Sequence, residues 1–252
     1  MDIRGKRVVV TGGSRGLGLG VVESLVERGA VVTAVARGPA DLQAAERRLS
    51  IAVRVADIND PSAAGRILTD VKPDILILNA GTPPPMGRID QISWDDFSAN
   101  WNVDVRGTFG WTQAALRQPL APGSRVLMTS SGAAVNGSVL SGGYGGAKKM
   151  VWLLAKYADL FSLRSGLKIR FQTIVPQQMV GGTGTGDRGS HAYATADGIT
   201  QEQFLARFGP ALSPRAFGDF VVDILTDERH DRGLAFGVKA ATGLTVLEDA
   251  PA

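Results

Sequence analysis

The sequence predicts an α/β fold with a doubly wound parallel β-sheet and helices on both of its faces. Short aliphatic and β-branched runs alternate along the chain with segments of helical periodicity, which is the pattern of repeated strand–helix units. A glycine cluster at residues 12–20 directly follows the first of these runs. Because the chain shows no linker, repeat or low-complexity segment, residues 1–252 are predicted to form a single domain.

The individual elements follow from local pattern. The run Ile-Leu-Ile-Leu at 75–78 is purely aliphatic, which indicates a strand buried on both faces. The helix predicted over 61–70 begins near a proline, a residue favoured in the first helical turn. Strands are expected from residue 8 and over 30–37, 51–56, 75–78, 125–128, 169–175 and 234–238, and helices after the glycine cluster and over 41–49, 61–70, 94–116, 144–163 and 213–225.

Composition excludes several classes of function. Apolar residues make up 44% of the chain and charged residues 20%, which is ordinary for a globular protein with a sizeable core. The chain has no cysteine, so disulfides and thiol catalysis are excluded, and no His/Asp/Glu cluster indicates a metal site. The net charge is +3 without a run of Lys or Arg, which argues against nucleic-acid binding. Without a signal peptide or a membrane-spanning apolar run, we expect a cytoplasmic protein that binds no membrane.

The glycine cluster has the spacing of a dinucleotide-binding turn. Gly12, Gly16 and Gly18 follow a strand and open a helix. Glycines there permit positive φ and close approach of the backbone to a pyrophosphate, while the helix start supplies free N–H groups. A glycine-rich turn without a ligand remains the alternative for this motif alone. No Gly-Lys-Ser or Gly-Lys-Thr follows, which disfavours an NTPase phosphate loop.

The residues after the second predicted strand indicate which dinucleotide would bind. An acidic residue there would hold the ribose hydroxyls of NAD, but no acid lies between Glu27 and Asp41. The chain instead has Arg37 there, and Arg15 in the glycine turn. Two guanidiniums suit a 2′-phosphate, so NADP(H) is predicted in preference to NAD(H), unless both arginines are simply solvated.

A second group of residues points to acid–base chemistry. Tyr144 and Lys148 are four positions apart, which places them on one face of a helix. A phenol normally titrates near ~10, and a neighbouring ammonium lowers that pKa, so such a pair can exchange a proton with a substrate. The same spacing is also common in helices with no catalytic role. Upstream, the hydroxyls of Thr129, Ser130 and Ser131 end a strand, where they could contact a substrate or cap a turn.

Taken together, these motifs resemble the short-chain dehydrogenase/reductase family over about residues 4–176. The resemblance rests on the glycine pattern of 11–18, Asn79-Ala80-Gly81, Ser131, and Tyr144-x-x-x-Lys148, in the family's order. It implies a Rossmann-like fold and catalytic residues Ser131, Tyr144, Lys148 and Asp104. It also implies that a cofactor is held by Gly12, Ser14, Arg15, Gly16, Leu17, Gly18, Arg37, Asp57, Ile58, Asn79, Ala80, Gly81, Tyr144, Lys148 and Pro176.

The resemblance implies hydride transfer between a nicotinamide and a small-molecule carbonyl or alcohol, with Tyr144 passing the proton. Lys148 would bind the nicotinamide ribose, and Ser131, thirteen residues before Tyr144, would orient the substrate in preference to Ser130. A binding-only sensor or scaffold on the same fold is the alternative. It is motivated by the departures from the family pattern described next.

Two positions depart from the family pattern. Asp104 occupies the place of the family's catalytic Asn, and could act through its backbone carbonyl or by pairing its carboxylate with Lys148. Asn102 is two positions away, about 200° around a helix, and should face elsewhere. After Pro176 the family's Gly and Thr are missing, and Thr183 or Thr185 could replace that threonine.

Two further expectations concern a loop and an interface. Residues 181–200 are predicted to be a polar, glycine-rich loop, part of a substrate-binding lid over about 181–210 that includes His191, Tyr193 and Phe204. A lone loop histidine such as His191 is more often solvated than functional. The helices at 94–116 and 144–163 carry more aromatic residues than one face of a sheet needs, and in the family they form subunit interfaces. A homotetramer is therefore predicted, with a dimer as second choice.

Overall fold

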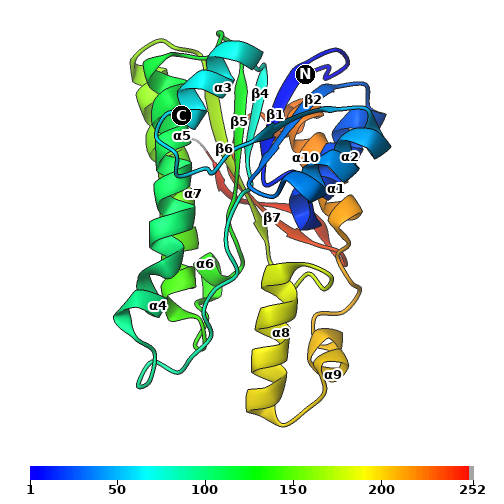
Figure 1. Ribbon diagram of the computed structural model, residues 1–252, viewed down its shortest axis with the longest axis vertical. Coiled ribbons are helices and arrows are strands. Elements are labelled where there is room, and N and C mark those ends of the chain that lie inside the picture. Colours follow the sequence, from blue (N-terminus) through cyan, green and yellow to red (C-terminus); the bar gives the residue numbers. More distant parts are fainter. Residues whose placement is uncertain (250–252) are drawn as a thin grey trace.

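The computed structural model, described here for residues 1–249, is built on an eight-stranded sheet in the order β3-β2-β1-β4-β5-β6-β7-β8 (Figure 1). Every neighbouring pair is parallel except β7 and β8, which are antiparallel. The predicted doubly wound fold is therefore confirmed. The strands are β1 Arg7–Thr11, β2 Val31–Ala36, β3 Ala52–Val55, β4 Ile75–Leu78, β5 Arg125–Thr129, β6 Arg170–Pro176, β7 Gly233–Lys239 and β8 Gly243–Asp249.

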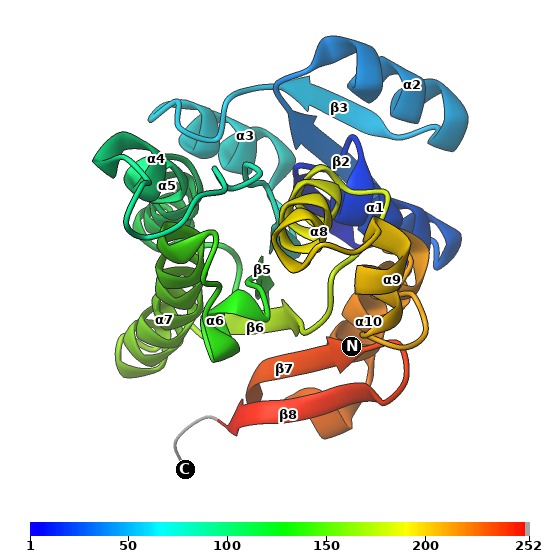
Figure 2. The same cartoon turned by 90° about the horizontal axis from the view of Figure 1, so that it is seen from below.

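Helices cover both faces of this sheet, with one hydrophobic core beneath each layer (Figure 2). One layer contains α1, α2 and α10, and the other contains α3, α5 and α7. No helix within residues 1–249 is both long and apolar enough to cross a membrane. The helices are α1 Gly16–Glu27, α2 Pro39–Leu49, α3 Ala63–Val71, α4 Trp94–Asn100, the π-helical turn η1 Trp101–Val105, α5 Arg106–Arg117, α6 Ala133–Asn136, α7 Gly142–Arg164, α8 Gly184–Asp197, α9 Gln201–Ala206, α10 Pro214–Thr226 and the 3₁₀ turn η2 Glu228–His230.

The prediction of a loop over 181–200 is wrong, because most of this segment forms helix α8. Thr183 caps the helix by accepting a hydrogen bond from the Gly186 amide at 3.0 Å, and Gly198 ends it with a φ of +66°. The glycines that lower intrinsic helix propensity are used for close packing instead. A Cβ on Gly186 would lie 1.9 Å from the Val180 carbonyl oxygen. Tertiary contact therefore overrides the local preference.

Strand β8 was not expected from the sequence, in which residues 234–238 were predicted to be the last strand. After β7 the chain turns at Gly243, whose φ is +73°, and β8 returns antiparallel along β7. The run Leu-Thr-Val-Leu at 244–247 consists of aliphatic and β-branched residues, which favours a strand, and Val246 is exposed at this edge of the sheet. Glu248 on β8 accepts a hydrogen bond from the Trp152 indole at 2.9 Å, which ties this edge strand to α7.

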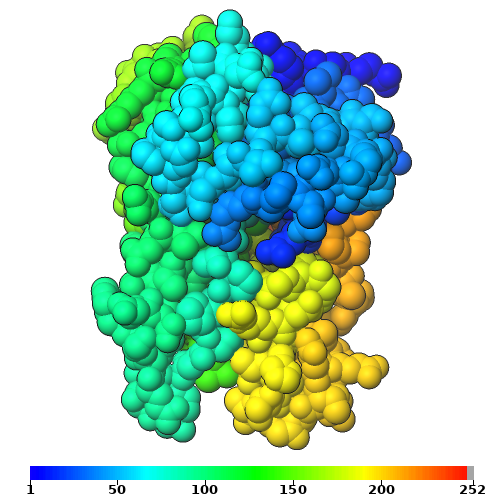
Figure 3. Space-filling view, in the orientation of Figure 1, coloured from blue at the N-terminus to red at the C-terminus, as the bar shows by residue number. Residues whose placement is uncertain are grey.

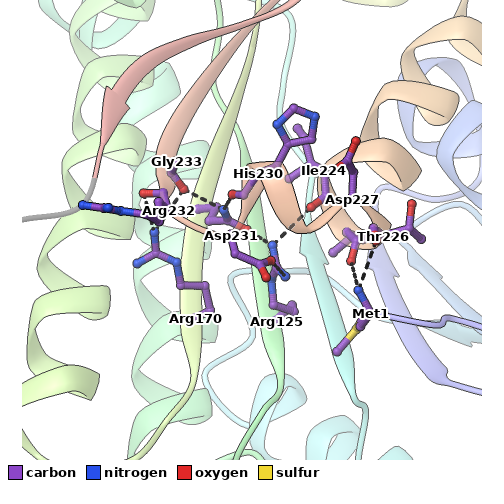
Figure 4. Close-up of polar contacts among 12 residues, drawn as sticks. Met1, Arg125, Arg170, Ile224, Thr226, Asp227, His230, Asp231, Arg232 and Gly233 are labelled. Carbon is purple, nitrogen blue, oxygen red and sulfur yellow. Dashed lines mark hydrogen bonds and ion pairs between the residues drawn. The ribbon is translucent and has the colours of Figure 1, made fainter. Parts of the chain in front are cut away.

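The amino ends of the central strands are fixed by a buried polar cluster (Figure 4). Arg125, at the start of β5, donates to Asp231 at 2.9 Å and to Gln172 on β6 at 2.5 Å. Arg170, at the start of β6, pairs with Asp159 of α7. Because these groups hold the strands together at one end, the opposite, carboxyl ends are left to form a site.

Candidate functional site

A cleft of about 720 Å³ lies at the carboxyl ends of the parallel strands, beneath α8 and α9. In the space-filling view the surface of α8 meets that of the segment after β4 (Figure 3). Gly184 and Pro83 lie at this junction, where a Cβ on Gly184 would be in van der Waals contact with Pro83, at 3.4 Å. The lining of the cleft includes sixteen of the predicted site residues: Gly12, Ser14, Arg15, Gly16, Leu17, Arg37, Asp57, Ile58, Asn79, Ala80, Gly81, Asp104, Ser131, Tyr144, Lys148 and Pro176.

Gly18, the remaining predicted residue, lies behind the cleft and supports the turn. A Cβ on Gly18 would lie 2.1 Å from the Gly12 carbonyl oxygen and 2.6 Å from the side-chain nitrogen (Nδ2) of Asn79. Gly12 and Gly16 have φ values of +67° and +54°, which a residue with a side chain rarely adopts. The three glycines thus have two different tasks, since two of them shape the turn and Gly18 lets α1 start close beneath it.

The start of α1 fits an anionic ligand. Arg15 at the N-cap has an extended backbone and makes no side-chain capping bond, and within residues 1–249 the first turn of α1 carries no acid. Its backbone amides therefore meet the cleft with the positive end of the helix dipole. This observation fits the pyrophosphate of a dinucleotide, which the sequence predicted on spacing alone.

The loop after β4 is held against this turn by Thr11. The Thr11 hydroxyl accepts hydrogen bonds from the backbone amides of Asn79, at 3.1 Å, and Ala80, at 3.2 Å, and donates to the Ile77 carbonyl at 3.3 Å. The segment Asn79–Gly81 is thereby fixed along the floor of the cleft. Thr11 was not among the predicted site residues, because a threonine ending a strand gives no distinctive signal.

Arg37 and Asp57 lie together at the end of the cleft near β2 and β3. The Arg37 guanidinium is 3.8 Å from the Asp57 carboxylate, and both side chains are largely exposed. Arg15 is exposed at the same end. Because a solvated ion pair of this kind is weak, the donors of Arg37 remain available to a ligand.

The hydroxyl residues after β5 divide between two tasks. Ser130 is buried, and its hydroxyl donates to the Lys148 carbonyl of α7 at 2.8 Å. Ser131 is half-buried and lines the cleft. The geometry therefore agrees with the preference for Ser131 as the substrate-facing serine, whereas Ser130 joins β5 to α7.

Tyr144 and Lys148 lie one turn apart on α7, facing the cleft. The Lys148 ammonium is 5.6 Å from the centre of the Tyr144 ring. Burial raises the pKa of Tyr144, and the Lys148 ammonium and the Ser131 hydroxyl oppose this rise without overcoming it. The expected lowering of the Tyr144 pKa is thus wrong for this arrangement, because burial outweighs the effect of a lysine whose charge is partly neutralised.

Asp104 is the neutralising group. Its carboxylate lies 3.0 Å from the Lys148 ammonium, and both side chains are buried. Burial lowers the pKa of Lys148, but the charge and hydrogen bond of Asp104, together with the nearby Tyr144, more than compensate, so the net shift is upward. Of the two routes left open by the sequence, the structure therefore shows the carboxylate pairing with Lys148.

A π-helical turn places Asp104 in this position. The turn η1 interrupts the helix between α4 and α5, and such interruptions are frequent at functional sites. The other oxygen of Asp104 accepts a hydrogen bond from the Thr82 amide at 2.8 Å, while Asn100 donates to the Thr82 carbonyl at 2.8 Å. Asn102 is exposed and turned toward Ser98, as expected from its rotation around the helix. Asn100 and Thr82 are contributors that the motifs did not reveal.

The lid is formed by α8 and α9 and reaches across the cleft. The Tyr193 hydroxyl lies 2.8 Å from that of Ser138 and accepts a hydrogen bond from the Leu140 amide at 3.3 Å. His191 is exposed on α8 and does not line the cleft, whereas Thr183 and Thr185, the suggested replacements for the family threonine, both do.

Comparison with known proteins agrees with this geometry. The family model described as short chain dehydrogenase matches residues 6–187. The chain is 28% identical over 173 residues to the 2,3-dihydro-2,3-dihydroxybenzoate dehydrogenase of Escherichia coli, covering 67% of this chain and 68% of that enzyme. It is 32% identical over 151 residues to the galactitol 2-dehydrogenase of Rhizobium johnstonii, covering 55% and 54%. The chain thus matches about half to two thirds of the length of these curated relatives.

Solved structures resemble nearly the whole chain. A short chain dehydrogenase from Burkholderia cenocepacia in complex with NADP superposes with a TM-score of 0.77 at 24% identity, covering 94% of this chain and 96% of that one. The chain therefore belongs to the short-chain dehydrogenase/reductase family, a class of nicotinamide-dependent oxidoreductases that interconvert carbonyls and alcohols.

The pairing of Asp104 with Lys148 predicts the ionisation of Tyr144. Asp104→Asn removes a negative charge that disfavours tyrosinate, so the pKa of Tyr144 should fall. Tyrosinate absorbance followed during a pH titration measures this pKa. The chain has three tyrosines, and subtracting the titration of Tyr144→Phe isolates the relevant one.

Asp95→Asn, an equivalent change at an exposed position of α4, serves as control and should leave the titration as it is. An Asp104→Asn variant whose Tyr144 titrates at the same or a higher pH than the parent protein contradicts the electrostatic coupling.

Proposed function

We propose that this protein is an NADP(H)-dependent oxidoreductase that interconverts a ketone or aldehyde with an alcohol. The observation that carries the proposal is one continuous cleft with the glycine turn at one end and Ser131, Tyr144 and Lys148 at the other. This combination favours catalysis over the alternative of a sensor or scaffold, because a binding-only protein has no need of a buried acid–base group beside a hydroxyl donor.

The residues of the cleft have complementary tasks in this proposal. The amides at the start of α1 hold the pyrophosphate, and Asp57 and Ile58 lie where the adenine would bind. Bound NADPH supplies a hydride to the carbonyl carbon. The Tyr144 phenol donates its proton to the carbonyl oxygen, which Ser131 orients, so that the ketone and NADPH plus one proton yield the alcohol and NADP⁺. Lys148 binds the nicotinamide ribose and is kept charged by Asp104.

The charge state of Tyr144 favours reduction at neutral pH. Because burial raises its pKa, the phenol is protonated and ready to donate. Reduction should therefore persist through the neutral range and decline only as the pH rises through the raised pKa of Tyr144. Oxidation of the alcohol needs the phenolate and should increase over that same alkaline range.

The preference for NADP(H) rests on Arg15 and Arg37. A similar solved structure contains NADP, and a xylitol dehydrogenase of the same fold, at a TM-score of 0.80 and 21% identity over 93% of this chain and 97% of that one, contains NAD⁺. The fold therefore accepts either cofactor. The two exposed guanidiniums at the β2 end of the cleft favour the one with a 2′-phosphate.

A homotetramer, or a dimer as second choice, is part of the proposal. Large side chains on α4, η1, α5 and α7 are exposed although they are apolar, which is unusual for a free surface. Two of them, Tyr157 and Phe161, are about half exposed on α7. The full set is Trp94, Trp101, Phe109, Tyr157, Phe161 and Leu163.

Removal of the Tyr144 hydroxyl tests the proposed chemistry. Tyr144→Phe should lower kcat for carbonyl reduction by about 100-fold to 10,000-fold, the range ascribed to a general acid. Quenching of tryptophan fluorescence by NADPH should show nearly unchanged binding. A variant that keeps most of its activity would refute the assignment, and the pH profile of the parent enzyme provides a second check on the same group.

Cofactor choice is tested at Arg37. Arg37→Ala should weaken NADPH binding roughly tenfold to a hundredfold, since a hydrogen bond to a charged group contributes about 1.5–3 kcal/mol, and should alter NADH binding little. Arg15→Ala should act in the same sense. Arg164→Ala, an exposed change at the far end of α7, is the matched control. Equal losses for the two cofactors, or a parent protein that prefers NADH, would overturn the choice of NADP(H).

The interface is tested by light scattering coupled to size-exclusion chromatography. The parent protein should elute with the mass of four chains, or of two. Phe161→Asp should reduce that mass, because it places a charge in the proposed contact. Val55→Asp changes an equally exposed apolar residue on the edge strand β3 and should not. A monomeric parent protein contradicts the proposal.

A further inference from the structure

The wall of the cleft formed by the lid is apolar and aromatic. Met179 precedes α8, Tyr193 lies on α8, and Phe204 and Phe208 belong to α9 and the turn after it. Met86, from the segment after β4, faces the same space. These side chains line the part of the cleft that the glycine turn and the β2 end do not occupy, which is where a substrate would lie.

The aromatic side chains of this wall form a rigid platform. The rings of Tyr193 and Phe204 are stacked, with centres 5.6 Å apart and planes inclined by 10°. Phe208 meets Phe204 edge-on, with ring centres also 5.6 Å apart. Tyr193 is fixed by Ser138 and Leu140 across the cleft, so the platform is ordered before a ligand binds.

The charges of this region are already compensated. In the described chain, the charged side chains that line the cleft away from the β2 end form two pairs. Lys148 lies 3.0 Å from Asp104, and Arg207 lies 2.5 Å from Asp197. Arg207 also lies over the Phe204 ring, 5.5 Å from its centre. An anionic substrate would meet the carboxylate of Asp104 or Asp197 beside either cation, and the Lys148–Asp104 pair is buried as well.

Several polar side chains of this region, those of Ser138, Ser141 and Gln178, are similarly occupied. Ser138 and Ser141 are hydrogen-bonded to each other, and Ser138 also to Tyr193. The Gln178 amide donates to the Pro210 carbonyl at 2.9 Å and accepts from the Ala240 amide at 2.7 Å. A substrate with many hydroxyls would therefore replace existing hydrogen bonds, and would gain little by doing so.

From this arrangement we infer that the substrate is a neutral ketone or aldehyde with a planar apolar ring next to its carbonyl group. The ring would pack against Tyr193, which the buried Phe204 supports from behind, while Ser131 and Tyr144 hold the carbonyl oxygen. This inference rests on the proposed oxidoreductase function and specifies its substrate class. It disfavours carboxylates, phosphorylated compounds and polyols.

Three carbonyl compounds separate the contributions of ring and charge. Methyl benzoylformate is neutral and has a ring, benzoylformate has the same ring with a carboxylate, and methyl pyruvate is neutral without a ring. With NADPH as cofactor, kcat/KM for methyl benzoylformate should exceed that for each of the other two at least about tenfold, consistent with more than about 1.4 kcal/mol of discrimination.

Two variants connect these preferences to named residues. Phe204→Leu should raise KM for methyl benzoylformate far more than for methyl pyruvate. Phe161→Leu, on α7 outside the cleft, should leave the KM values of both substrates as they are in the parent protein. Asp197→Asn removes the carboxylate that pairs with Arg207, and should therefore reduce the difference in kcat/KM between benzoylformate and its methyl ester.

The outcomes distinguish this inference from the function on which it rests. If kcat/KM for benzoylformate or for methyl pyruvate equals or exceeds that for methyl benzoylformate, the inference of a neutral substrate with a ring is overturned and the oxidoreductase function is retained. Absence of turnover with all three compounds and both cofactors counts against the function. Isothermal titration of the NADP⁺-loaded protein with the ester and the acid then decides the inference, since tighter binding of the acid contradicts it.

Discussion

The ion pair between Asp104 and Lys148 joins the three segments on which the reacting end of the cleft depends. Asp104 lies on the π-helical turn, Lys148 lies on α7, and Thr82 follows β4 and donates its amide to the same carboxylate. A buried pair repays little of the cost of removing two charges from water, but loss of one partner leaves the other uncompensated, at a cost of about 3–5 kcal/mol. The pair therefore fixes the relative positions of these three segments more than it adds to the free energy of unfolding.

This constraint also sets the chemistry of Tyr144. An unpaired lysine beside a buried phenol would favour the phenolate, whereas a lysine that shares its charge with a carboxylate leaves burial as the dominant influence. The site then approaches electrical neutrality at its reacting end, while the other end presents the exposed guanidiniums of Arg15 and Arg37, the latter beside Asp57. The proposed NADP(H) and the inferred uncharged substrate would thus occupy opposite halves of one cleft.

Much of this arrangement follows from the sequence, since parallel strands bring their carboxyl ends to one edge. Residues that follow β1, β4 and β5 must therefore meet, and the glycine spacing, Asn79 and Ser131 are recognisable for that reason. The sequence also left open how Asp104 acts. The sign of the Tyr144 shift could not be predicted, because it depends on burial and on a third charge, neither of which the four-residue spacing reveals.

The lid shows where local reasoning fails. The glycines of 181–189 predicted a loop, yet the chain forms α8, in which Gly186 packs against the Val180 backbone and Gly189 against the Met179 side chain. The hydrogen bond between Tyr193 and Ser138 joins residues distant in sequence, and the stacking of Tyr193 on Phe204 joins two consecutive helices, so neither has a periodic signal. Cofactor-holding residues are encoded in short motifs near strand ends, whereas substrate-facing residues depend on tertiary packing. Members of a family can therefore share cofactor-holding residues and differ in substrate-facing ones. The substrate class has to be argued from the charges and rings that the fold brings together.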